Sequence, residues 1–318
     1  MTTRIVVGML SFLFLVTGGC VDGDITNIDE VTSPVWERHR DTQSTAVLSS
    51  PVTLSGFATP ESMVHDEIDD VYLVSNINGH PFGLDDNDGF ISRVDPAGGI
   101  IELKWIDGED ENVTLRAPKG ITIFGEVLYV SDVDAMRMFD RANGEPIGEI
   151  PIEPEPDLLN DIGAGPNGVL YMTDSGLNPD FDRTNNDALF KIDRDGNVET
   201  MASGEELACP NGVVALGSNV FVVSFCSNII YRVNPSGKLF SVAELPEGGL
   251  DGVVRLTDGT LVVSSWDGSA IYSVSPNRRS IETLITDVIT PADIGYDETR
   301  NTLLIPLFAE DEIILYPL

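Results

Sequence analysis

Four residues at corresponding positions of a repeated pattern carry side-chain oxygen atoms that could bind a cation: Glu61, Asn160, Asn211 and Asp251. Two are carboxylates and two are amides, and none is His or Cys. Hard oxygen ligands favour Ca²⁺, Mg²⁺ or Mn²⁺ over Zn²⁺ or Cu²⁺. Because Ca²⁺ takes about 6–8 oxygen atoms, four protein ligands would leave room for water or a substrate oxygen. The pattern therefore predicts one divalent-cation site, with Ca²⁺ as the preferred ion.

Each of these residues also has an ordinary structural explanation. Asn and Asp beside Gly are common in turns, and the segment GGLDG predicts a tight turn around Asp251. Recurrence at equivalent positions nevertheless favours a site. The other two positions hold Lys119 and Ala292. The cationic Lys119 would either point away from a bound metal or contact an anionic substrate.

The elements that must position these residues are short strands in six similar units. Apolar stretches such as VYLVS and VFVVS end at Ser75, Ser131, Thr173, Ser224, Ser264 and Pro306, at intervals of 40 to 56 residues. The candidate residues lie 12 to 14 residues before these ends, where the innermost strand of a blade would begin. The repeat predicts an all-β, six-bladed β-propeller as a single domain over residues 51–318. A large β-sandwich is the alternative, but it does not explain six nearly equal units.

The last unit ends at Leu318 without an outer strand. The run at 47–54 could supply that strand and close the ring. Residues 1–19 read as a secretory signal of the lipoprotein type, because an apolar run leads to small residues and Cys20. Lipidation of Cys20 would anchor the exported protein to a membrane, and residues 20–50 would form a flexible acidic tether. Ordinary signal cleavage before Cys20 is the alternative.

Export would permit a disulfide, and Cys209 and Cys226 are expected to pair. The alternative is two buried free thiols. The formal net charge of −34, from 52 acids and 18 bases, argues against a nucleic-acid partner. It is compatible with cation binding and with a solvated acidic surface. We expect a monomer that acts on a small-molecule substrate or ligand.

Other candidates for chemistry are weaker. His65 and His80 could act as bases near the same site, but a structural or solvent-facing role is favoured for a lone His. The acidic stretch at 85–89 does not have the spacing of a calcium-binding loop. The loops at 76–89, which we expect to be flexible, and at 175–187 would shape substrate access. The sequence contains no nucleophile elbow, phosphate loop or dinucleotide fingerprint.

The segments PESMVHD, LLNDIGAGPNGVLYMTD, CPNGVVALGSNVFVVS and GLDGVVRLTDGTLVVSSWDG resemble the regucalcin/gluconolactonase family of six-bladed propellers. The resemblance covers about residues 51–318. It implies a divalent metal on the axis, often Ca²⁺, and hydrolysis of lactones or related esters. Glu61, Asn211 and Asp251 would be metal ligands, and Asn160 would contact the metal or the substrate. Asp251 would also be the general base that takes a proton from water while the metal polarises the carbonyl.

Two positions depart from the family pattern. Leu158 stands where sugar-lactone members have a substrate-binding Arg, and Leu250 stands where Pro is usual. The metal site therefore carries over better than sugar specificity, and a less polar lactone or ester is equally compatible. The competing hypothesis is a propeller lipoprotein that binds a ligand or a protein without catalysis and holds a structural metal.

Overall fold

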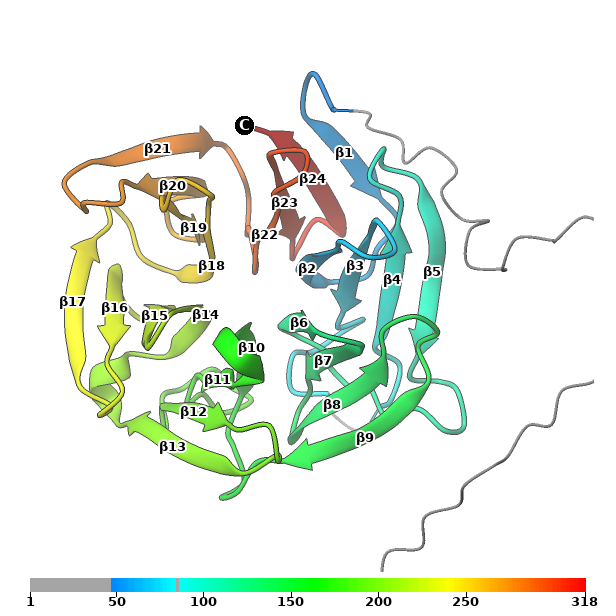
Figure 1. Ribbon diagram of the computed structural model, residues 1–318, viewed down its shortest axis with the longest axis horizontal. Coiled ribbons are helices and arrows are strands. Elements are labelled where there is room, and N and C mark those ends of the chain that lie inside the picture. The colour runs from blue at the N-terminus through cyan, green and yellow to red at the C-terminus, as the bar shows by residue number, and fades with distance from the viewer. Residues whose placement is uncertain (1–46, 84–85) are drawn as a thin grey trace, which may run out of the picture. The chain divides into compact units, whose positions relative to one another are not determined.

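The computed structural model describes residues 47–83 and 86–318. These residues belong to a compact unit that spans Ser44–Leu318. The expected signal peptide, the lipidation site Cys20 and residues 20–46 of the expected tether lie outside the described residues. Six four-stranded antiparallel sheets surround a common axis (Figure 1), which confirms the six-bladed β-propeller. None of the helices among the described residues is long and apolar enough to cross a membrane.

Five blades are built from four consecutive strands each. Blade 1 contains β2 (Pro60–Asp66), β3 (Val71–Asn76), β4 (Phe90–Val94) and β5 (Ile100–Asp107). Blade 2 contains β6 (Ile121–Phe124), β7 (Val127–Ser131), β8 (Ala135–Asp140) and β9 (Pro146–Pro151). Blade 3 contains β10 (Leu159–Ala164), β11 (Leu170–Asp174), β12 (Ala188–Ile192) and β13 (Val198–Ser203). Blade 4 contains β14 (Pro210–Leu216), β15 (Asn219–Ser224), β16 (Ile229–Val233) and β17 (Leu239–Glu244). Blade 5 contains β18 (Leu250–Arg255), β19 (Leu261–Ser265), β20 (Ala270–Val274) and β21 (Ile281–Thr286).

The sixth blade joins the two ends of the domain. It contains β22 (Gly295–Asp297), β23 (Thr302–Leu307), β24 (Glu312–Pro317) and β1 (Val52–Ser55). Strand β1 pairs antiparallel with β24, so the closing strand expected from the sequence is present. The strand itself covers 52–55, which is shorter than the expected run at 47–54. Leu54 is buried and packs in a cluster with Leu315 and Ile313, which fixes the closure.

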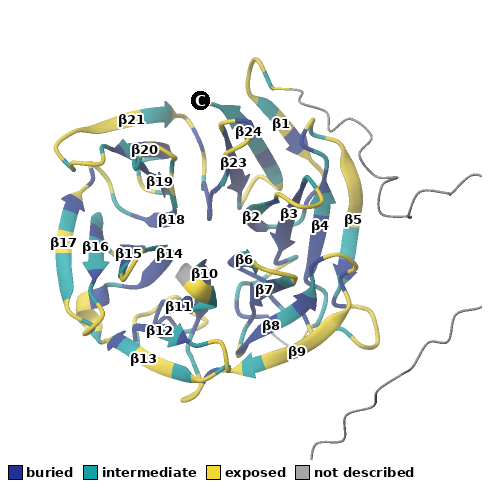
Figure 2. Cartoon of the chain, viewed as in Figure 1, coloured by how far each residue is buried: buried dark blue, intermediate teal, exposed yellow. Residues whose placement is uncertain are grey.

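Burial follows the position of each strand in its blade (Figure 2). All six residues of β3 are buried, whereas most residues of the outermost strand β9 are exposed. A strand inside a blade is covered on both faces by the neighbouring blades and therefore reads as a continuous apolar run. An outermost strand has a neighbouring strand on one side only and is more exposed to water.

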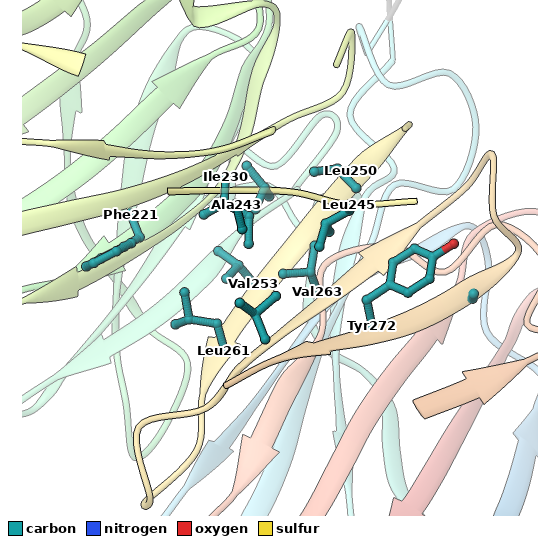
Figure 3. Close-up of a cluster of buried hydrophobic side chains, with 12 residues drawn as sticks. Phe221, Ile230, Ala243, Leu245, Leu250, Val253, Leu261, Val263 and Tyr272 are labelled. Carbon is teal, nitrogen blue, oxygen red and sulfur yellow. The ribbon is translucent and has the colours of Figure 1, made fainter. Parts of the chain in front are cut away.

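The hydrophobic core is divided among the contacts between blades. Figure 3 shows one such cluster, in which Phe221 and Ile230 of blade 4 lie with Val253 and Leu261 of blade 5. A single blade could not bury both of its faces, so its stability depends on its neighbours. The positions of the inner strands are thereby fixed by packing rather than by loops.

Blades 1 and 6 are also joined by a buried polar network. The His65 side chain is 4% exposed, and its Nε2 lies 3.1 Å from Asp70 Oδ1. The Tyr72 hydroxyl donates to Asp297 at 2.7 Å, and Arg300 forms salt bridges with Asp70 and Asp297. His65 therefore has the structural role that was favoured for it, at the junction of the two blades.

Candidate functional site

Five of the six positions aligned by the repeat meet in one cavity of about 380 Å³. We call these six positions the ring residues: Glu61, Lys119, Asn160, Asn211, Asp251 and Ala292. All except Ala292 line the cavity, and Ala292 is fully buried. The repeat in the sequence therefore brings together, in three dimensions, the side chains that were singled out from it.

A β-bulge aims the oxygen-bearing ring residues. In β2, β10, β14 and β18 the pairing register shifts at the ring position, so two residues oppose one on the next strand. A bulge of this kind redirects side chains locally. Glu61 lines the cavity, while the next residue, Ser62, lines a second cavity of about 330 Å³ toward the other end of the innermost strands. Similar irregularities occur just before β22 and β6: Pro291 bridges Leu307 while Gly295 pairs with Leu304, and Lys119 and Gly120 both hydrogen-bond to Ser131.

The glycines beside the ring residues serve a different purpose from the turn expected in the sequence. Asp251 is the second residue of strand β18, so the prediction of a tight turn around it is wrong. A Cβ atom at Gly252 would lie 2.3 Å from the Ile294 nitrogen, and one at Gly212 would lie 2.4 Å from the Asp251 carbonyl oxygen. The glycines are needed because the inner strands of neighbouring blades approach very closely at the axis.

Each of the four candidate ligands has a buried oxygen atom without a hydrogen-bond partner. These atoms are Glu61 Oε2, Asn160 Oδ1, Asn211 Oδ1 and Asp251 Oδ1. Buried polar atoms are normally satisfied, so four unsatisfied acceptors in one cavity point to a missing positive partner. Within the described part of the chain, no group of three or more His, Cys, Asp and Glu side chains could hold a metal ion. A cation site here therefore depends on the two asparagines as well as on the two acids.

The orientation of the Asn160 amide follows from its neighbour. The Ser175 hydroxyl donates to the Pro210 carbonyl at 2.8 Å. That hydroxyl must then accept its other hydrogen bond, which comes from Asn160 Nδ2 at 3.1 Å. The amide is fixed with Oδ1 free, as a cation ligand requires.

Burial and repulsion from nearby carboxylates disfavour the charged forms of Glu61 and Asp251. Burial, followed by repulsion from Asp251 and Asp293, raises the pKa of Glu61 well above its usual range. Burial, with repulsion from Asp161, raises the pKa of Asp251 to about 8. The Trp266 indole favours the charged form of Asp251, although its N–H makes no hydrogen bond of normal geometry. A bound cation would reverse these shifts by stabilising the carboxylates.

Lys119 lines the cavity, and its ammonium group is already engaged. Its Nζ donates to the Ala117 carbonyl at 2.8 Å and to the Pro81 carbonyl at 3.1 Å. Burial lowers its pKa to about 8, against the opposing effects of Asp132 and Glu61. Lys119 thus neither points away nor presents a free ammonium group, and one of its three protons remains for a ligand.

A second set of equivalent residues forms the wall of the cavity above the ring residues. The sequence did not predict them. We call these the wall residues: Ile77, Ser175, Phe225, Trp266 and Phe308. Each comes directly after the second strand of its blade, and all five line the cavity. Each backbone N–H donates to the carbonyl two residues before the ring position, as in Trp266 to Gly249 at 2.9 Å. Their equivalence becomes apparent only once the end of the second strand in each blade is known.

The wall residues are held by aromatic contacts and by the disulfide. The rings of Phe225 and Trp266 lie 5.3 Å apart, as do those of Trp266 and Phe308. Cys209 and Cys226 form the expected disulfide. The Phe225 N–H donates to the Cys209 carbonyl at 2.8 Å, so the bridge braces both Phe225 and the turn before Asn211.

The hydroxyl groups of the Ser and Thr residues at the ends of the apolar stretches also support the ring. The Thr173 hydroxyl accepts from the Asp161 N–H at 3.0 Å and donates to the Asn211 carbonyl at 2.7 Å. The Ser264 hydroxyl accepts from the Gly252 N–H at 2.7 Å and donates to the Ala292 carbonyl at 2.8 Å. These hydroxyls therefore join the ring segment of one blade to that of the next.

The remaining candidates lie beside the cavity. His80 packs against Phe82 and Phe181 and is not among the lining residues. In the acidic loop, positions 84–85 are outside the described residues. Asn87 donates to the Val113 carbonyl at 2.9 Å. This bond holds the described part of the loop, which we expected to be flexible, against the chain before blade 2. The loop at 175–187 does shape the cavity, since it contributes Leu177 and Phe181.

Known structures share the fold of this chain at low sequence identity. A gluconolactonase from Xanthomonas campestris is 18% identical, with a TM-score of 0.67 over 84% of this chain and 89% of its own. A luciferin-regenerating enzyme is 12% identical, with a TM-score of 0.62 over 84% of this chain and 97% of its own.

A lyase also shares the fold. Virginiamycin B lyase from Staphylococcus aureus is 16% identical, with a TM-score of 0.59 over 84% of this chain and 99% of its own. No protein-family model and no curated protein matches the sequence. The comparisons therefore establish the propeller fold, and the different chemistries among these proteins mean that function must be argued from the site.

Proposed function

We propose that this protein is a metal-dependent hydrolase of lactones or related esters. The observation that carries the proposal is the convergence of four unsatisfied oxygen atoms, from four blades, on one cavity. Glu61, Asn160, Asn211 and Asp251 would hold one divalent cation, with Ca²⁺ preferred over Mg²⁺ or Mn²⁺ for an all-oxygen set. When bound, such a cation supplies Lewis-acid polarisation of an ester carbonyl and lowers the pKa of a coordinated water.

The residues of the chain have distinct roles in this proposal. Asp251 would accept a proton from the attacking water, and the Trp266 indole beside it would favour the deprotonated form that a base requires. Asn160 would orient the substrate or complete the cation site through its free Oδ1. Lys119 would contribute a positive charge near the substrate through its one uncommitted proton. The apolar wall would exclude water from the reacting groups.

The similarity to a gluconolactonase supports this chemistry, although at 18% identity it supports the fold more directly than the reaction. The competing proposal is a ligand-binding propeller that holds a structural cation in the same site. The apolar wall is compatible with such binding. Turnover distinguishes the two proposals, because only the hydrolase releases acid from a lactone.

The same proposal places the protein outside the cytoplasm. The Cys209–Cys226 disulfide supports export, because such bonds persist in oxidising compartments. Anchoring through a lipidated Cys20 remains part of the proposal and is tested by mass spectrometry of the mature N-terminus.

The test of function is acid release in a pH-stat from a panel of lactones and esters, with Ca²⁺ and with a chelator. We expect Ca²⁺-dependent hydrolysis that falls at least about 100-fold in Asp251→Asn, the lower end of typical general-base contributions. Asp195→Asn makes the same chemical change on an exposed turn and should retain full activity. A fully active Asp251→Asn variant would rule out Asp251 as the base.

A further inference from the structure

The cavity divides its surface between a polar floor and an apolar wall. The floor consists of the five ring residues that line the cavity, and four of the five wall residues are apolar. Leu158, Leu177 and Phe181 extend the apolar surface. A volume of about 380 Å³ lies within the range of about 300–1,000 Å³ that is typical of small-molecule sites.

The wall offers almost no hydrogen bonds to a polar ligand. Ser175, its polar member, already donates to Pro210 and accepts from Asn160. The Trp266 indole N–H is buried without a partner, but it lies beside Asp251 at the floor. A ligand covered with hydroxyl groups would leave most of them unsatisfied, at a cost of about 1–3 kcal/mol each.

Phe181 adds an aromatic ring at the rim of the cavity. Phe181 is 53% exposed, and its φ of 61° is uncommon for a residue with a side chain. The conformation is held because the Phe181 N–H donates to the Asn178 carbonyl at 2.8 Å, and Asn178 Oδ1 accepts from Asp182 N at 2.9 Å. The ring packs edge-on against Phe82, with centroids 5.7 Å apart. An apolar group kept exposed by such a turn fits a role in covering a ligand.

We infer that the substrate is a lactone or ester with a hydrophobic substituent, rather than a polyhydroxylated sugar lactone. The ester group would face the ring residues, and the substituent would lie between Trp266, Phe308 and Phe181. That the ligand is a substrate rests on the proposed function. The preference of the cavity for an apolar ligand does not depend on turnover.

The experiment uses γ-lactones that differ only in the length of an alkyl chain, with gluconolactone as the polar comparison. Each buried methylene contributes about 0.8 kcal/mol, so kcat/KM should rise about fourfold per methylene until the cavity is filled. Phe181→Ser should reduce this gain for the longer chains. Ile147→Ser is the matched control, because Ile147 is 52% exposed on the outer strand β9.

A second series separates this inference from the hydrolase proposal. The γ-lactams of the same chain lengths resist hydrolysis, and their binding is measured by calorimetry. Affinity that rises with chain length, without hydrolysis of any lactone, would support the apolar ligand and contradict the hydrolase. Hydrolysis that favours gluconolactone, or lactam affinity that does not change with chain length, would overturn the inference.

Discussion

Asp251 and Asp132 are both buried acids, but their surroundings shift their pKa values in opposite directions. Burial opposes the charge of Asp132, yet hydrogen bonds from the Ala117 N–H and from Arg137 lower its pKa overall. For Asp251 the effect of the Trp266 indole is outweighed by burial and by repulsion from Asp161, and its pKa rises to about 8. Asp132 is thus a structural carboxylate whose charge is balanced by its hydrogen-bond partners. The charge of Asp251 would need a bound cation or a proton to balance it.

This difference predicts how stability depends on pH when no cation is present. Because the pKa of Asp251 is raised in the folded protein, the folded state holds a proton that the unfolded chain releases above about pH 4. Stability should therefore fall as the pH rises from about 4 to about 8. Urea unfolding in a chelator should show Asp251→Asn to be more stable than the wild type at pH 8, by at least about 1.4 kcal/mol.

Two comparisons check that prediction. The gap between Asp251→Asn and the wild type should shrink at pH 5, where Asp251 is protonated in the folded state. Asp195→Asn should follow the wild-type pH profile. A constant difference between wild type and Asp251→Asn across this range would show that the Asp251 carboxyl titrates normally.

At the residue scale, the sequence singled out the polar residues that line the cavity and missed the apolar ones. Glu61, Asn160, Asn211 and Asp251 share an alignment and a chemistry, so their recurrence was visible. Trp266 and the other wall residues share a position but differ in residue type, so composition did not connect them. Their common feature is the backbone hydrogen bond after the second strand, which becomes visible only once strand ends are known.

At the scale of the element, the bulge and the glycine act together. The bulge turns Asp251 toward one cavity, and Gly252 lets β18 approach the chain beside Ile294. The sequence predicted that an innermost strand begins here, which is correct. It did not predict the bulge, because a bulge is a property of pairing between two strands rather than of either strand alone.

Substitution of Gly252 tests this close approach. Gly252→Ala should destabilise the protein by about 1–3 kcal/mol or more, because the added Cβ meets backbone atoms that cannot move aside. The control is Gly99→Ala, where the nearest atom to an added Cβ is 3.8 Å away. Thermal unfolding of both variants measures the effect. Equal melting temperatures would contradict the account of close packing at the axis.

At the scale of the whole molecule, the site exists only because the ring closes. The oxygen-bearing residues come from blades 1, 3, 4 and 5, and blade 1 is held to blade 6 by β1 and by the Arg300 network. The sequence predicted both the number of blades and the closing strand, because those features follow from repeat length and from the incomplete last unit. The cavity depends on how six blades tilt around an axis, which no local pattern specifies.

The net charge of −34 also acts at this scale. A strongly negative protein concentrates cations near its surface, and the effect weakens as salt screens it. Apart from Lys119, the ring contributes no positive charge to offset its two acids. The long-range field and the local site therefore favour the same kind of ligand.

The central claim is that the four oxygen-bearing ring residues form one cation site, and calorimetric titration of the chelator-treated protein with Ca²⁺ tests it most directly. We expect Ca²⁺ to bind one-to-one, with binding lost in Asp251→Asn and unchanged in Asp195→Asn. Mg²⁺ and Mn²⁺ should bind at the same site and compete with Ca²⁺. Absence of binding by the folded protein, or binding that Asp251→Asn leaves unchanged, would contradict it.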